Sequence, residues 1–165
     1  MNIFVLDNDP MKAAQYAVDR HVVKMPTETS QLLITRLAEE KHIQPPLNKS
    51  GNIFRPLSKA HLKHPCYLWL KESDANFRWL VQFGRFQCAE YTYRYGRRHF
   101  SENYIDFAAR HLHLFPANDE LTEHKQAMPE YLRNADVVTA YRNYYLREKH
   151  YLFNWKKRER PFWTS

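Results

Sequence analysis

Residues 74–96 have the sequence DANFRWLVQFGRFQCAEYTYRYG, in which hydrophobic side chains recur at the spacing of an amphipathic helix. The residues that fall largely on one side of that helix are Phe77, Leu80, Val81, Phe83, Cys88 and Tyr91. Ser73 precedes the stretch as an N-cap candidate, and Gly96 follows it as a candidate C′ glycine. The pattern therefore predicts a long helix with a buried face.

The sequence before this helix predicts further helical structure. Residues 2–6 (NIFVL) suit a short strand or extended segment, and Asp9 and Pro10 then supply an N-cap and an N1 proline. A helix is expected from Pro10 to about residue 41, and Pro26 should kink or divide it. Residues 44–59, with three prolines and a glycine, form the clearest loop.

The C-terminal half follows the same pattern. We expect a short helix over residues 66–73, another that begins at Ser101 and ends before Pro116, and a last one over residues 136–153. Residues 116–132 are polar and typical of turns, and residues 154–165 form a basic and aromatic tail that should lie outside the core. The prediction is a single all-α domain over residues 1–165, with a strand-like N-terminal segment.

Composition limits the classes of protein that fit. The chain has 165 residues, of which 44% are hydrophobic, so one domain with one core is expected. Only three glycines are present, which disfavours a β-sandwich, a Rossmann unit or a P-loop. Two cysteines, Cys66 and Cys88, are expected to be reduced core residues. No apolar run is long enough to cross a membrane, and we expect a soluble, cytoplasmic, monomeric protein.

The spacing of histidine and cysteine residues bears on metal binding, and the net charge bears on the kind of partner. His61, His64 and Cys66 lie close together, but their spacing matches no structural zinc pattern, so no metal or other cofactor is expected. The formal net charge is +7. That balance favours a polyanionic partner such as DNA or RNA, although a merely cationic soluble surface is an alternative.

The segment 19–31 (DRHVVKMPTETSQ) carries the strongest candidate for catalysis. On a helix, His21, Lys24, Glu28 and Gln31 form one polar line. A carboxylate beside an amine can manage a proton in acid–base or Schiff-base chemistry. The alternative is an ordinary surface ion pair between Lys24 and Glu28, with His21 solvated.

Basic residues also alternate with aromatic ones, in residues 91–100 and 141–160. Cations attract phosphate and flat rings stack on exposed bases, although the tyrosines could equally fill the core. The nucleic-acid-binding candidates are Arg20, Gln31, Arg94, Arg97, Arg98, Arg142, Lys149, Lys156, Arg158, Arg160 and Trp163.

Three blocks of the sequence resemble the phage pyrimidine-dimer DNA glycosylase/AP lyase family of the endonuclease V type. The first is Asp19-x-His21 with Glu28 seven residues later, and the second is HPCYLW at residues 64–69 with the helix that follows. The third is RPFW at residues 160–163, with Lys156 upstream. These blocks cover about half the chain. Residues 21–25 (HVVKM) also resemble a segment found in an uncharacterised group of phage-type proteins.

The resemblance implies a helical enzyme that flips a nucleotide and uses Glu28 to stabilise an oxocarbenium-like sugar. In that family the nucleophile is the α-amino group of an N-terminal threonine, whereas residue 2 here is Asn, a residue that usually leaves Met1 in place. Thr27 and Gln31 stand where the family has arginines, so specificity for pyrimidine dimers is not carried over.

We therefore predict a DNA N-glycosylase, with AP lyase activity if an amine attacks the sugar. The catalytic candidates are Glu28, His21, Lys24 and Met1. Two alternatives are a non-catalytic protein that binds single-stranded DNA or RNA, and an enzyme that acts on a free nucleotide.

Overall fold

The computed structural model describes residues 1–54 and 57–164, and over these residues the protein is all-α, as predicted. The α-helices are α1 (Pro10–Gln15), α2 (Asp19–Lys41), α3 (Pro65–Glu72), α4 (Asp74–Tyr95), α5 (Glu102–Arg110) and α6 (Val137–Glu148). Short 3-10 helices cover Lys59–Lys63, Leu112–Leu114, Glu130–Leu132, His150–Leu152 and Phe162–Thr164. Within the described residues there is no strand, only an isolated bridge between Leu47 and Ile53.

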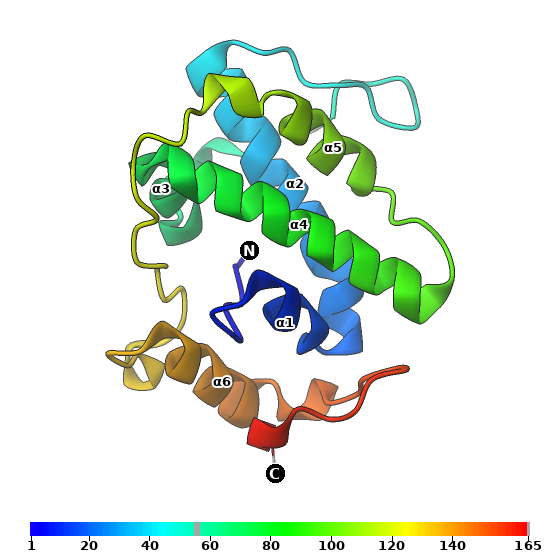
Figure 1. Ribbon diagram of the computed structural model, residues 1–165, viewed down its shortest axis with the longest axis vertical. Coiled ribbons are helices and arrows are strands. Elements are labelled where there is room, and N and C mark those ends of the chain that lie inside the picture. The colour runs from blue at the N-terminus through cyan, green and yellow to red at the C-terminus, as the bar shows by residue number, and fades with distance from the viewer. Residues whose placement is uncertain (55–56, 165) are drawn as a thin grey trace.

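The long helix α4 lies at the centre, in contact with α1, α2, α3 and α5 (Figure 1). All six of its predicted core residues are buried. Gly84 lies where α4 meets α2 and α5, and a Cβ at this position would come within 3.0 Å of side-chain atoms of Ile105 and Thr29. A larger residue here would therefore push the side chains of Ile105 and Thr29 by a few tenths of an ångström, and glycine avoids this crowding.

The predicted helix caps are present. The Asp9 side chain accepts a hydrogen bond from the Met11 N–H at 2.8 Å, and Ser73 Oγ accepts one from the Asn76 N–H at 3.0 Å. Gly96 adopts a left-handed φ of 69° at the end of α4. Ser101 precedes α5 as predicted, without a side-chain capping bond.

The N-terminal helical region was predicted to kink or divide at Pro26, and a division at this residue was wrong. The chain leaves the helix between α1 and α2, where Val18 has an extended ψ of 154°, and α2 continues through Pro26. Proline removes one N–H from the helical ladder. The carbonyl that loses its helical N–H donor is that of Val22, four residues earlier, and the next carbonyl, that of Val23, lies 3.0 Å from His99 Nε2, outside the helix.

Both ends of the chain pack against the helices. The N-terminal residues 2–6 are buried but pair with no strand, and the Leu6 N–H donates to the Phe4 carbonyl at 3.0 Å in a tight turn. The tail was expected outside the core, yet Trp155 is buried and its Nε1–H donates to the Tyr16 carbonyl at 2.9 Å. The last predicted helix ends earlier than expected, at Glu148.

Two further expectations concern the interior and the membrane. Cys66 and Cys88 are free and buried, as predicted. Among the helices of the described residues, none combines the length and the apolar character needed to span a bilayer.

Candidate functional site

Helix α2 places the predicted polar line along one side of its N-terminal half. Lys24 Nζ lies 3.1 Å from Glu28 Oε1. The Lys24 side chain is 68% exposed whereas that of Glu28 is only 13% exposed. The ion pair therefore consists of a solvent-exposed amine and a largely buried carboxylate. A buried carboxylate with a cationic neighbour is unlike the freely solvated pair of the alternative interpretation.

The first residue of the chain reaches the same carboxylate. The α-amino nitrogen of Met1 lies 3.7 Å from Glu28 Oε2, and the Asn2 backbone N–H donates to that oxygen at 3.1 Å. Glu28 therefore has one amine beside each of its two oxygens. This arrangement brings together three of the four catalytic candidates.

Chain geometry explains how Met1 meets Glu28. The Phe4 ring stacks on the His21 imidazole, with ring centroids 4.4 Å apart and planes 12° apart. From His21 to Glu28 the helix rises about 10.5 Å, and three residues of extended chain reach about 10 Å. The N-terminal segment therefore runs along α2 in the opposite direction, and the Phe4 contact positions Met1 at Glu28.

The side chain of Asn2 fixes this segment in place. Its Nδ2 donates to the Ala127 carbonyl at 2.8 Å, and its Oδ1 accepts hydrogen bonds from the Tyr141 hydroxyl and the Ile3 N–H, both at 2.8 Å. Sequence analysis missed Asn2 and Tyr141 as positioning residues. Their partners lie 125 and 139 residues away along the chain, so no local pattern could have revealed them.

His21 has a different place from the one predicted. It is 8% exposed, its Nδ1 lies 2.6 Å from the Tyr145 hydroxyl, and Phe4 covers its ring. Burial, followed by the charges of Lys149 and Lys24, lowers the pKa of the His21 imidazole to about 4. His21 is thus neither solvated nor open to a substrate, and it supports the N-terminal segment instead.

The buried neutral state of His21 makes stability depend on pH. Its pKa is about 4 in the folded protein against an ordinary value of 6.5, so the unfolded chain binds the proton first. The free energy of unfolding should fall as the pH decreases from 6.5 to 4, by up to about 3 kcal/mol from this residue. Urea unfolding at several pH values measures this fall.

Substitution of His21 by Gln separates its contribution from that of His124, whose pKa burial also lowers to about 4. The fall in stability should be smaller in His21→Gln and unchanged in His150→Gln, a control at an exposed histidine. Equal pH dependence in His21→Gln and the unmodified protein would contradict the assignment.

His64 and Cys66 lie on the other side of the amine. His64 caps α3, and its Nδ1 accepts a hydrogen bond from the Cys66 N–H at 3.2 Å. Burial, followed by the charge of the N-terminal amine, lowers the pKa of His64. Burial raises the pKa of the Cys66 thiol to about 12, so Cys66 is no nucleophile at neutral pH. In the described residues no group of three or more His, Cys, Asp or Glu side chains could hold a metal ion.

No family model, no curated protein and no solved structure matches the chain. The candidate site therefore rests on the positions of its own residues.

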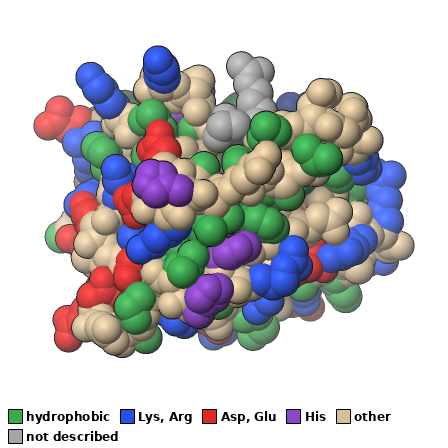
Figure 2. All heavy atoms as spheres, turned by 90° about the horizontal axis from the view of Figure 1, so that it is seen from above, with side chains coloured by type: hydrophobic (Ala, Val, Ile, Leu, Met, Phe, Trp, Pro, Cys, Tyr) green, Lys and Arg blue, Asp and Glu red, His purple; other side chains and the backbone are tan. Residues whose placement is uncertain are grey.

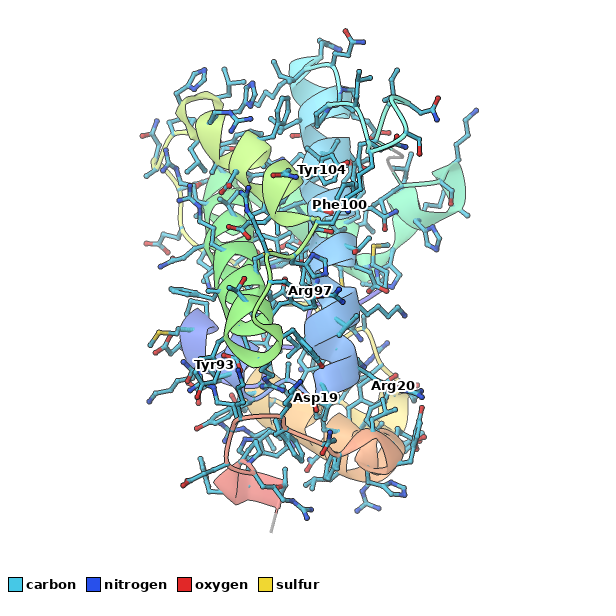
Figure 3. All side chains as sticks on the ribbon, turned by 90° about the vertical axis from the view of Figure 1, so that its right-hand side faces the viewer. Asp19, Arg20, Tyr93, Arg97, Phe100 and Tyr104 are labelled. Carbon is cyan, nitrogen blue, oxygen red and sulfur yellow. The ribbon has the colours of Figure 1, made fainter. Side chains whose placement is uncertain are left out.

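The nucleic-acid-binding candidates divide by exposure. The exposed ones are Arg20, Arg97, Arg98, Lys156 and Arg160. Of these, Arg98 forms ion pairs with Glu102 and Asp106 at 3.1 and 2.9 Å. Arg20 and Arg97 lie along one side of the molecule, on α2 and just after α4 (Figure 3). Lys24 of the candidate site is also exposed and lies one helical turn after Arg20 on α2.

Arg94 is a correction to the predicted set. It is fully buried, and its guanidinium binds Glu90 at 2.6 Å, Asp19 at 2.8 Å and the Gln15 carbonyl at 2.8 Å. A side chain with no exposed surface cannot contact DNA. Arg94 holds α4 against α1 and α2.

The remaining candidates are half-buried. They are Gln31, Arg142, Lys149, Arg158 and Trp163. Arg142 donates to the Leu6 carbonyl and pairs with Asp7 at 3.0 Å, while Arg158 pairs with Glu90 at 2.8 Å. These two arginines therefore have structural partners already.

Exposed rings accompany the basic residues at the end of α4. Tyr93 is 48% exposed and lies under Arg158, whose Cζ is 4.2 Å from the ring centroid. Lys156 Nζ lies 5.1 Å from the Tyr95 ring. Tyr93 and Tyr95 were not among the named candidates, although the alternation of aromatic and basic residues in 91–100 pointed to them.

Proposed function

We propose that the protein is a DNA glycosylase with an associated lyase step, in which the α-amino group of Met1 attacks the sugar of an altered nucleotide. The observation that carries the proposal is the position of this amine 3.7 Å from a carboxylate that is 13% exposed. An amine beside a partly desolvated acid has the two functional groups that Schiff-base chemistry at a sugar requires.

The reaction balances with these groups alone. The neutral amine attacks C1′ of the nucleotide, a C–N bond forms, and the glycosidic bond breaks with its electron pair leaving on the base. One amine proton goes to the departing base, and the other goes to O4′ as the sugar ring opens to an imine. Glu28, 3.7 Å from the amine, relays these protons and stabilises positive charge that develops on the sugar.

Met1 is a better nucleophile in this site than Lys24. The Met1 side chain is 5% exposed and the segment is held by Asn2, whereas the Lys24 side chain is 68% exposed on the helix surface. A held amine loses less entropy when it attacks.

The surroundings of the site favour DNA as the substrate. Arg20, Lys24 and Arg97 supply exposed positive charge, and Tyr93 an exposed ring. Phosphates bind such cations, and a base displaced from the duplex can stack on a ring. Thr27 and Gln31 are uncharged, so neither adds a cation beside Glu28.

Replacement of Glu28 by Gln tests the proposal. The variant keeps the shape of the side chain but loses its charge and its ability to carry a proton, so cleavage should fall by about 10²–10³-fold. The measurement uses end-labelled oligonucleotides, each with one altered base, followed by alkali and gel analysis. Glu123→Gln, at an exposed glutamate, is the matched control and should cleave normally.

Two results of this experiment would reject the proposal. If both proteins retard the oligonucleotides equally and cut none, the chain is a non-catalytic binder of nucleic acid. If Glu28→Gln cuts as fast as the unmodified protein, Glu28 has no part in the reaction.

A further inference from the structure

A second concave surface lies away from Glu28, between residues 46–49 and α5. It is an open groove of about 330 Å³, which is at the lower end of the range of small-molecule sites. The side chains that give it chemical character are Lys49, Phe100, Asn103, Tyr104, Phe107 and Arg110. We call it the α5 groove.

The groove pairs each of its cations with a ring. Lys49 Nζ lies 4.5 Å from the Phe100 ring centroid, and Arg110 Cζ lies 5.7 Å from that of Phe107. Tyr104 forms the base of the groove, where it stacks on Phe54 with centroids 3.8 Å apart. Among the described residues that line the groove none is acidic, so its charge is positive.

The position of the α5 groove relates it to the candidate site. The Thr27 hydroxyl lies 3.0 Å from the Ser101 hydroxyl. Thr27 directly precedes Glu28 and Ser101 directly follows Phe100, so this contact connects the candidate site to the α5 groove. Tyr104, Phe100, Arg97 and Arg20 follow one another in this order along one side of the molecule (Figure 3). From above, the acidic side chains gather mainly on the left of the view, whereas basic side chains lie on both sides (Figure 2).

We propose that the α5 groove binds one nucleotide unit, with its phosphate on Lys49 and Arg110 and its base against Phe100 and Phe107. Phosphate prefers a site with cations and no carboxylate, and a base gains stacking energy on an aromatic side chain. The proposal extends the proposed function by adding a second contact for the strand, but it does not require catalysis at Glu28.

Charge reversal of the two cations tests the α5 groove. Lys49→Glu with Arg110→Glu should weaken binding of a fluorescent single-stranded oligothymidylate by at least tenfold and reduce the salt dependence, because two phosphate contacts are lost. Both residues are exposed, so the fold should persist, which circular dichroism checks. The matched control is Lys12→Glu with Arg133→Glu, which makes the same charge change at exposed positions outside the groove.

Thymidine monophosphate serves as a second probe. Weaker binding of both probes only in the groove variant means that the groove takes a free nucleotide as well as a strand. Loss of oligonucleotide binding alone means that it takes a strand. Equal weakening in groove and control variants, or no weakening, overturns the proposal.

The same binding measurements, combined with cleavage assays of the protein with Glu28 intact and of Glu28→Gln, separate the two proposals. Binding that depends on Lys49 and Arg110, in a protein that cleaves no altered base even with Glu28 intact, supports the α5 groove and rejects the glycosylase. Cleavage that depends on Glu28, together with binding that does not depend on Lys49 and Arg110, supports the glycosylase and rejects the α5 groove.

Discussion

Acetylation of the Met1 α-amino nitrogen should abolish covalent capture of DNA, with a loss of at least about 10³-fold. An amide nitrogen cannot form an imine, so no adduct remains for borohydride to reduce. The effect should exceed that of Glu28→Gln, because the amine makes the bond whereas Glu28 at 3.7 Å assists it. The measurement is the yield of protein–DNA adduct after borohydride treatment of an oligonucleotide with an abasic site.

Lys24→Arg is the control for this prediction. Arginine keeps the positive charge near Glu28 but forms no stable imine with an aldehyde, so adduct formation should continue if Met1 is the nucleophile. Loss of the adduct in Lys24→Arg, together with its survival after acetylation of Met1, would transfer the role to Lys24. Binding of the uncut oligonucleotide, measured in parallel, shows whether each modified protein still folds.

Substitution of Arg94 by Met should lower the free energy of unfolding by about 3–5 kcal/mol. The guanidinium is completely buried and pairs with Glu90 at 2.6 Å and Asp19 at 2.8 Å. Its removal leaves a carboxylate that is itself 2% exposed, with Arg158 as its remaining ionic partner. Urea unfolding at neutral pH measures the loss.

The matched control is Arg85→Met on the same helix. Arg85 is 55% exposed and its ion pair with Asp106 is long, at 3.8 Å, so the loss should stay below about 1 kcal/mol. A loss below about 1 kcal/mol in Arg94→Met as well would mean that the buried network contributes little to stability.

The helices were predictable because their signals are local. The hydrophobic spacing of residues 74–95 and the caps at Asp9, Ser73 and Gly96 depend on neighbours within a few positions, and all of these predictions were confirmed. Pro26 does not divide α2, because the effect of a proline on a helix depends on its surroundings. The continuous helix has a tertiary contact from His99 near this point, which the local sequence does not encode.

The site was only partly predictable for the same reason. Lys24 and Glu28 lie one turn apart on α2, and their ion pair follows from the helix. The charge of Arg94 suggested a surface role, but its partner Asp19 lies 75 residues away in the sequence. The polar line also gave no sign that Phe4 would cover His21.

The most direct test of the central claim is to identify the amine that is captured. The protein is incubated with an abasic duplex and borohydride between pH 6 and 8, the adduct is digested, and mass spectrometry locates the modified residue. The account predicts modification of the α-amino nitrogen of Met1, beside Glu28, and loss of this product in Glu28→Gln. No adduct at any pH in this range, or an adduct at Lys24 alone, would contradict it.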